Sequence, residues 1–198
     1  MTEGLTFDEA GHVYRWDGAT VPSVTQILAP LSDFSRVPYD VLEFARERGT
    51  AVHAAISLAQ ADDLDEDSLD PVIVPYVEGW RRFMTETGFV PEEWERPLYH
   101  PRYRYAGTFD AAGLLWKTRA VVDFKTGLEV PLSVGPQLAA YQQLINTERQ
   151  GRNPVLARYA VQLTGGGGYK LEQFTRPDDW VAFQSLLNLW NWRQNGAK

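Results

Sequence analysis

Apolar and polar residues follow two different periods along this chain, and the period changes several times. Apolar positions recur three and four residues apart in four segments, which predicts helices at 39–61, at 72–87, at 137–148 and from residue 177 to near the C-terminus. Alternation predicts strands at 94–99, 155–164 and 169–175, and a pair of strands within 106–127. The first 21 residues predict a β-hairpin followed by a short helix. This mixed order predicts an α/β fold with a mixed central β-sheet flanked by helices.

The length of the chain limits its domain organisation. With 198 residues, 44% of them hydrophobic, the chain is expected to form one domain that spans 1–198. Residues 1–38 are expected to form the N-terminal hairpin and short helix, and residues 39–198 the core. The four glycines at 165–168 lack the lysine and the following helix of a phosphate-binding loop, so they predict a hairpin connection.

The composition excludes several classes of site. The chain has no cysteine, which excludes disulfides, cysteine nucleophiles, thiolate zinc sites and iron–sulfur clusters with cysteine ligands. No segment has the pattern of a secretory signal or the length of a membrane span, so we expect a cytoplasmic protein without membrane contact. The net charge of −7 argues against a broad nucleic-acid surface and leaves room for a local basic cleft.

The segment at 106–127, AGTFDAAGLLWKTRAVVDFKTG, sets three charged residues into an otherwise apolar hairpin. Side chains alternate between the two faces of a strand, so Asp123 and Lys125 share one face. A turn centred on residues 117 and 118 places Asp110 opposite Lys125 and diagonal to Asp123. A register slip by one residue would turn Asp110 to the other face, so the predicted cluster depends on this turn.

Such a cluster of charges has a recognisable chemistry. Two neighbouring carboxylates repel each other unless a cation neutralises them, and their oxygens suit Mg²⁺ or Mn²⁺. With a lysine on the same face, the set fits phosphodiester hydrolysis: the metal polarises the phosphate and activates a water, and the lysine orients that water or offsets developing charge. An ordinary ion-pair cluster on an exposed strand is the alternative. The apolar residues of VVDFK argue against it, because buried charges are costly without a partner.

Four stretches of the chain carry a resemblance to the PD-(D/E)xK nuclease superfamily. They are RGTAVHAAI, YAGTFDAAG, VVDFKTG and QLAAYQQL, they follow the order of the family, and they lie between residues 48 and 144. Within the superfamily the chain looks most like RecB-type nuclease domains and phage exonucleases. The resemblance implies a restriction-endonuclease-like core and a DNA nuclease that depends on Mg²⁺ or Mn²⁺. It favours a phage-type or recombination and repair exonuclease in a bacterial or phage-infected cell.

The resemblance also implies roles for individual residues. Asp110, Asp123 and Lys125 match the catalytic positions of the family. Metal ligation is implied for Asp110 and Asp123, for His53 on the first long helix, and for the backbone carbonyl of Phe124. The chain departs from the family members that bind an iron–sulfur cluster, because it has no cysteine. It also lacks the helicase segments of the RecB proteins.

Four further residues are candidates for substrate binding. Gln137 and Tyr141 match the helix motif of the group and are expected near the DNA backbone or in support of the site. The segment 96–105 interleaves arginines with tyrosines and contains no acid, so Arg102 and Arg104 are expected to contact the phosphates of a strand that enters the site. An edge strand protected by charge explains this segment equally well.

Several other residues are weaker candidates. Glu95, Glu43 and Glu47 could each add a carboxylate, although exposed positions explain them as well. Gly49 precedes His53 by four residues and marks either a close approach of backbone or DNA, or a break in the helix.

Alternatives stay open for the function and for the partners. An endonuclease on the same fold, or a non-catalytic DNA-binding accessory domain of recombination, would use the same architecture. A recombination or single-strand-annealing partner protein could supply the DNA affinity that a chain of net charge −7 lacks. Trp180, Trp190 and Trp192 are expected in the core or an interface. Exposure of Trp190 and Trp192 would indicate a homo-oligomer, because phage exonucleases of the resembling family can form rings.

Overall fold

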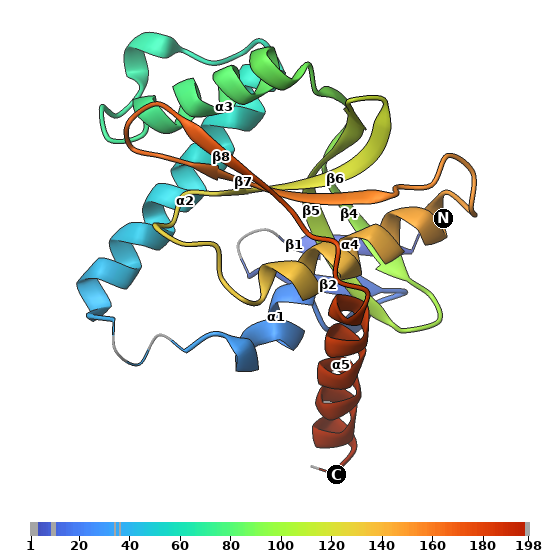
Figure 1. The fold of residues 1–198 in the computed structure, drawn as a ribbon. Coiled ribbons are helices and arrows are strands. Elements are labelled where there is room, and N and C mark those ends of the chain that lie inside the picture. Colours follow the sequence, from blue (N-terminus) through green and yellow to red (C-terminus); the bar gives the residue numbers. More distant parts are fainter. Residues whose placement is uncertain (1–3, 9–10, 34, 36, 197–198) are drawn as a thin grey trace.

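The computed structural model describes residues 4–8, 11–33, 35 and 37–196. A five-stranded sheet with the order β4-β5-β6-β7-β8 forms its centre (Figure 1). The strands are Val90–His100 (β4), Tyr105–Leu115 (β5), Thr118–Lys125 (β6), Ala157–Leu163 (β7) and Tyr169–Gln173 (β8). Only β6 and β7 pair in parallel, and the other neighbours are antiparallel. The predicted α/β fold with a mixed central sheet is therefore confirmed.

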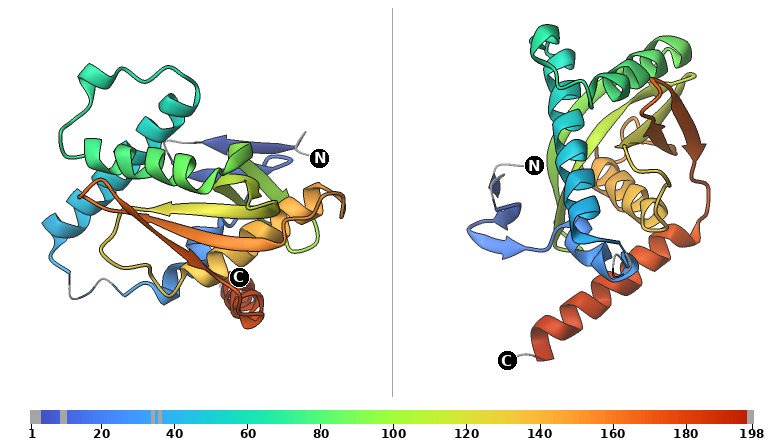
Figure 2. Two further views of the ribbon diagram at one scale, coloured as in Figure 1. Left: turned by 45° about the horizontal axis from the view of Figure 1, so that its top comes forward. Right: turned by 90° about the vertical axis from the view of Figure 1, so that its left-hand side faces the viewer.

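Helices cover both faces of this sheet, and each face has its own apolar core (Figure 2). One face is covered by α2 (Tyr39–Gln60) and α3 (Val74–Thr87). The other is covered by α1 (Val24–Leu28), α4 (Val134–Glu148) and α5 (Asp178–Gly196), and two 3₁₀ turns follow α1 and α2 at Ala29–Leu31 and Glu66–Ser68. Each predicted helix is present within a few residues of its expected bounds. In the described part of the chain, no helix is long and apolar enough to cross a membrane.

The predicted N-terminal β-hairpin is confirmed, and a third strand extends it into a small antiparallel sheet. The three strands are Leu5–Asp8 (β1), Val13–Trp16 (β2) and Ala19–Val21 (β3). The third strand exists because Asp17 and Gly18 both take left-handed backbone angles, which makes the tight turn that returns the chain. Tyr14 fixes this small sheet on the central one, with its hydroxyl 2.8 Å from Thr108 Oγ1. The expected division of the domain at residue 38 stays a prediction.

The hairpin of β5 and β6 turns one residue earlier than the sequence indicates. Trp116 and Lys117 form the turn, both with left-handed backbone angles, and Leu115 pairs with Thr118. The predicted pairing of Asp110 with Lys125 was therefore wrong, because the register differs by two residues. Two adjacent left-handed residues give the turn that matches the twist of the strands. An even shift leaves every side chain on its predicted face, so the expected convergence of charges is not lost.

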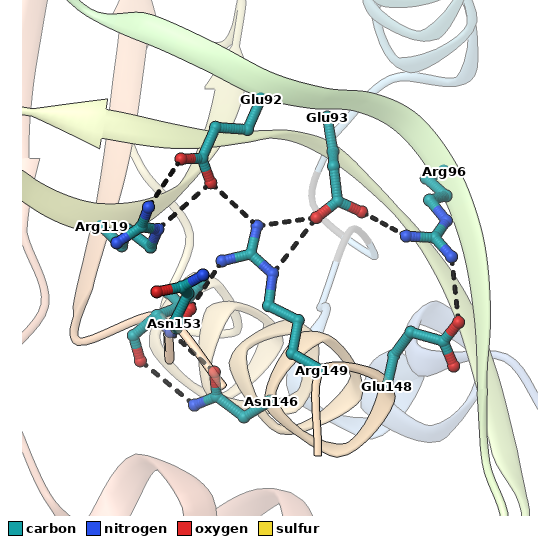
Figure 3. A network of polar contacts seen from close by, with 9 residues as sticks. Glu92, Glu93, Arg96, Arg119, Asn146, Glu148, Arg149 and Asn153 are labelled. Atoms are coloured by element: carbon teal, nitrogen blue, oxygen red, sulfur yellow. Dashed lines mark hydrogen bonds and ion pairs between the residues drawn. The ribbon is translucent and has the colours of Figure 1, made fainter. Parts of the chain in front are cut away.

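A network of charged side chains ties the start of β4 to the end of α4 (Figure 3). Arg149 Nη2 lies 2.7 Å from Glu93 Oε1 and 3.1 Å from Glu92 Oε2. Arg96 lies between Glu93 and Glu148, with Nη2 3.0 Å from Glu148 Oε1. Arg96, which belongs to the arginine-rich segment, is thus neutralised within the protein.

The tryptophans of α5 have different environments. Trp180 and Trp190 are half-buried against the core of the α4 and α5 face, whereas Trp192 is 72% exposed. The C-terminal end of α5 extends past the body of the domain (Figures 1 and 2). A contact between copies through this helix stays a prediction.

A buried ion pair anchors the first turn of α5 to the central sheet. Arg158 Nη1 lies 3.1 Å from Asp179 Oδ2, and both side chains are at most one tenth exposed. We expect Asp179→Ala to lower the free energy of unfolding by about 3 kcal/mol, because it leaves the Arg158 charge buried and unpaired. The neighbouring exposed Asp178 is the control, and Asp178→Ala should cost less than about 1 kcal/mol. Urea denaturation measures both, and equal losses would contradict the anchoring role.

His100 at the end of β4 makes the stability depend on pH. Its Nδ1 accepts the backbone N–H of Tyr103 at 3.3 Å and its Nε2 lies 3.2 Å from Thr147 Oγ1, which requires the neutral ring. Burial, helped by the charge of Arg102, lowers the pKa of His100 from 6.5 to about 4. The unfolded chain therefore takes up this proton first, and stability is lost as the pH falls from 6.5 towards 4.

We expect this effect to amount to about 2 kcal/mol between pH 7 and pH 5. Urea denaturation at the two pH values should show a correspondingly smaller loss in His100→Gln, which cannot titrate. His12 is an exposed histidine and supplies the control variant: the change in pH dependence should be larger in His100→Gln than in His12→Gln. An unchanged pH dependence in His100→Gln would refute the assignment.

Candidate active site

Asp123 and Lys125 of β6 point to the side of the sheet that α4 covers, as their spacing predicts. Asp123 is 1% exposed, and its Oδ2 lies 2.7 Å from Lys125 Nζ. Burial opposes the charge of the lysine, but the carboxylates of Asp123 and Asp110 outweigh it and raise the pKa of Lys125. Lys125 is therefore held as a cation at neutral pH.

Asp110 reaches the same place from the neighbouring strand. The ladder between β5 and β6 ends at the pair of Ala111 and Val122, and beyond it Asp110 Oδ2 accepts the backbone N–H of Phe124 at 2.7 Å. Burial, reinforced by the charge of Asp123, raises the pKa of Asp110 to about 6, although His53 and Lys125 act in the opposite direction. Two carboxylates thus share a site with a single lysine.

His53 and Arg48 bring α2 to the end of β6. His53 Nε2 lies 3.2 Å from the carbonyl oxygen of Phe124, and its Nδ1 lies 3.8 Å from Asp110 Oδ2. Arg48, which precedes His53 by five residues on α2, donates from Nη2 to the carbonyl of Thr126 at 3.0 Å. The structure therefore brings together all the residues implied as metal ligands, namely His53, Asp110, Asp123 and the carbonyl of Phe124.

Gln137 and Tyr141 of α4 support the lysine from the opposite side. Lys125 Nζ donates to Gln137 Oε1 at 3.3 Å, and Gln137 Nε2 donates to the Tyr141 hydroxyl at 3.2 Å. Tyr141 is only 4% exposed and does not line the cleft described below, so its position fits support of the site rather than contact with DNA. Gly107 makes this possible, because a side chain there would lie 2.9 Å from the Tyr141 ring.

A cleft of about 910 Å³ opens in front of this cluster. Lys125, His53, Gln137 and the backbone segment at 124–127 form its floor and sides, while Asp123 lies behind Lys125. Among the lining residues that were not singled out from the sequence are Phe7 and His12 of the N-terminal segment and Arg46 of α2. No local pattern marks them, because they reach the cleft only through the packing of distant segments.

The donors of the cluster fit a hard divalent cation in their chemistry. Two carboxylates and a backbone carbonyl supply the oxygen ligands that Mg²⁺ and Mn²⁺ prefer, whereas the imidazole of His53 is a softer donor. The donors are not arranged as a ready-made site: the described residues contain no group of three or more His, Asp or Glu side chains placed to hold a metal. Instead, Lys125 neutralises Asp123, and His53 lies against Phe124. An incoming cation would have to replace these contacts.

Of the three weaker carboxylate candidates, only Glu95 lines the cleft, whereas Glu43 and Glu47 do not. Glu95 is exposed, lines the cleft and lies across from Asp110, since the residues on either side of it pair with the neighbours of Asp110. Its backbone is left-handed (φ 39°), a strained conformation for a residue inside a strand. Glu43 pairs with Arg46 at 3.8 Å on the surface of α2, and Glu47 is exposed; neither lines the cleft.

Arg102 and Arg104 do not lie at the cleft. They belong to the turn between β4 and β5, and they line a separate cavity next to α5. The expectation that they contact a strand as it enters the catalytic site therefore needs correction. It failed because the strand β4 is eleven residues long and carries its far end away from Asp110.

Gly49 lies inside an unbroken α2, so the predicted alternative of a helix break was wrong. A Cβ at this position would contact only Thr126 Oγ1, at 3.6 Å. We therefore expect Gly49→Ala to raise the free energy of unfolding by about 0.5–1 kcal/mol, because alanine is the better helix former. Gly79 of α3 is the matched control: its Cβ would lie 2.4 Å from the carbonyl of Gly168, so Gly79→Ala should destabilise the protein. Urea denaturation measures the free energy of unfolding of both variants. A destabilised Gly49→Ala would show that the position does not accommodate a methyl group.

Comparisons with known proteins give low similarities. No family model matches the chain, and no curated protein matches it. Among solved structures, SSO0001 aligns with 84% of this chain and 72% of its own, at 18% identity and a TM-score of 0.41. An alkaline exonuclease (LHK-Exo) from Laribacter hongkongensis aligns over 88% of both chains at 11% identity and a TM-score of 0.42. LHK-Exo in complex with dAMP aligns over 89% of both chains at 12% identity and a TM-score of 0.41.

Proposed function

We propose that this protein is a DNA nuclease that depends on Mg²⁺ or Mn²⁺ and acts as an exonuclease of the PD-(D/E)xK type. The observation that carries the proposal is that Asp110 and Asp123 come together behind Lys125, which itself lines the cleft. These residues come from two strands, and the family motifs place the same residue types in the same order.

The charge balance of the cluster supports catalysis over a structural ion pair. A structural pair needs one carboxylate for each cation, whereas here two buried carboxylates share Lys125. Burial, with a further contribution from the charge of Asp123, raises the pKa of Asp110 to about 6. A protein gains no stability from an excess of buried carboxylate charge. A divalent cation would remove it, which is the reason we infer one.

The proposed reaction is the hydrolysis of a phosphodiester bond. The oxygen of a water attacks phosphorus, the bond from phosphorus to the 3′ oxygen breaks, and that oxygen takes up a proton, so that the product keeps a 5′-phosphate. When bound, the metal ion would lower the pKa of the water and polarise the phosphate. Lys125, fixed by Asp123 and Gln137, donates hydrogen bonds to the water or to the phosphate oxygen on which charge develops.

The cellular setting belongs to the same proposal. We infer DNA as the substrate, in the cytoplasm of a bacterial or phage-infected cell, with recombination or repair as the process. The net charge of −7 weakens DNA binding outside the cleft, so a recombination or single-strand-annealing protein is the partner we propose for delivery. Contact between copies of the chain through the exposed Trp192 is the proposed route to an oligomer.

Cleavage of end-labelled linear DNA and of closed circular DNA, with Mg²⁺, Mn²⁺ or EDTA, tests this function. We expect metal-dependent loss of linear DNA, and a fall in rate of at least about 100-fold in Asp123→Asn and in Lys125→Met, because each removes a charge that acts in the transition state. Lys117→Met, in the exposed turn of the same hairpin, is the control and should keep the wild-type rate.

The outcomes separate the alternatives. Cutting of circles identifies an endonuclease on the same fold. Absence of cleavage by the folded protein in every metal refutes the enzyme and favours the accessory domain. A second readout does not need activity: Mn²⁺ should raise the melting temperature of the wild type and leave that of Asp123→Asn unchanged, because only the wild type binds the ion.

A further inference from the structure

A second cavity, of about 830 Å³, lies outside the cleft and has no role in the proposed reaction. It is enclosed by the turn between β4 and β5, by β3 and the start of α1, and by the last turns of α5. The two cavities are neighbours. On β4, Pro97 lines the cleft, and Tyr99 on the same face lines the second cavity. On α1, Thr25 lines the cleft and the adjacent Gln26 lines the second cavity.

The second cavity is positive in an acidic protein. Arg102 and Arg104 line it, both are exposed, and neither forms an ion pair within the described part of the chain. None of the residues that line it is Asp or Glu. By contrast, Arg96 and Arg149 are neutralised by neighbouring glutamates. In a chain with net charge −7, a carboxylate-free cavity with two free guanidinium groups favours an anionic ligand.

The turn that carries these arginines is anchored to the body of the protein through Tyr103. Tyr103 lies between them: its backbone N–H donates to His100, its hydroxyl accepts a hydrogen bond from Gln184 of α5 at 3.2 Å, and its ring packs edge-on against Trp180. Arg104 keeps a left-handed backbone (φ 55°), where glycine would be less strained. The guanidinium groups are therefore presented from an anchored turn.

The aromatic and amide side chains that line the second cavity are suited to binding nucleobases rather than a small anion alone. Trp16, stacked on Tyr99 at 4.3 Å, and Trp190 of α5 contribute flat rings on which bases can stack. Asn188, Asn191 and Asn195 also line the cavity; they lie three and four residues apart and so share one face of α5. Amide side chains both donate and accept hydrogen bonds, as base edges and phosphates require.

We infer that this cavity is a second nucleic-acid site, which holds a segment of single-stranded DNA outside the cleavage cleft. The identity of the ligand as DNA rests on the proposed function; the cavity, its charge and its stacking surfaces do not. Aromatic rings with arginines and amides fit an unpaired strand, whose bases are accessible, better than a duplex, whose bases are stacked inside. The position next to the cleft allows one strand to occupy both sites.

Binding of a fluorescein-labelled 20-nucleotide oligo(dT), measured by anisotropy in EDTA, tests the inference without any cleavage. We expect Arg102→Ala/Arg104→Ala to bind at least about tenfold more weakly and to lower the salt slope of log K by about 1.4, since two phosphate contacts are lost. Arg152→Ala/Lys170→Ala is the matched control: it removes the same charge from two exposed positions outside the cavity, and should bind within about twofold of the wild type.

A second variant tests the helix face. Asn188→Ala/Asn191→Ala changes two exposed amides, and we expect it to weaken binding about threefold or more without altering the salt slope, because no charge is removed. The inference is overturned if Arg102→Ala/Arg104→Ala and Asn188→Ala/Asn191→Ala both bind oligo(dT) with the affinity of the wild type. Equal losses in Arg102→Ala/Arg104→Ala and in the charge-matched control overturn it as well, because total charge would then explain them.

Two further probes fix the ligand class and separate this inference from the proposed function. Binding of a labelled poly-glutamate peptide as tight as that of oligo(dT) would identify an acidic protein chain as the occupant and overturn the DNA assignment. Oligo(dT) binding that depends on Arg102 and Arg104 in a protein without nuclease activity refutes the proposed function alone. Nuclease activity with binding that ignores both arginines refutes this inference alone.

Discussion

The backbone of Phe124 is the point on which the candidate site depends. Its N–H donates to Asp110 and its carbonyl lies against His53, so one peptide segment positions both residues. Its side chain is buried, stacked on Trp94 and edge-on to Phe83. A buried N–H must find a partner, and the ladder with β5 has ended at Ala111 and Val122, so Asp110 takes the place of a backbone acceptor. The apolar packing of the Phe124 side chain fixes its backbone, and the backbone N–H in turn positions the carboxylate of Asp110.

One face of β6 packs in an apolar core, and the other face carries the charged residues of the candidate site. Val122 and Phe124 belong to the core beneath α2 and α3, which fixes the strand in place. Asp123 and Lys125 face the other way, where α4 supplies Gln137 to orient the lysine. Charges can occupy this interior because Lys125 pairs with Asp123 and Asp110 accepts the backbone N–H of Phe124. Small appended elements, the N-terminal sheet and the end of α5, then shape the two cavities on either side of α1.

The sequence predicted the elements better than their pairing. The helices and strands were found because their periods of hydrophobicity are local properties of the chain. The hairpin register was missed by two residues, because Trp116 and Lys117 lack the Gly or Asn that usually marks such a turn. The sequence placed Asp110 in the cluster but gave no sign of its contact with the backbone N–H of Phe124. Phe109 and Ala112 pack in the core beneath α4 and α5, whereas Ala111 packs in the core beneath α2 and α3. The regular alternation of side chains along β5 is therefore interrupted next to Asp110.

By itself, the sequence determined that Asp123 and Lys125 share a face, that His53 lies on a long helix, and that a mixed sheet forms the centre. These follow from bond geometry and local periodicity, which a single chain segment carries in full. Only the tertiary structure decided that His53 meets the carbonyl of Phe124, and that Arg102 and Arg104 line a cavity of their own. Such contacts join segments 71 residues apart or lie between separate elements, and their geometry is set by the packing of two whole cores rather than by any neighbouring residue.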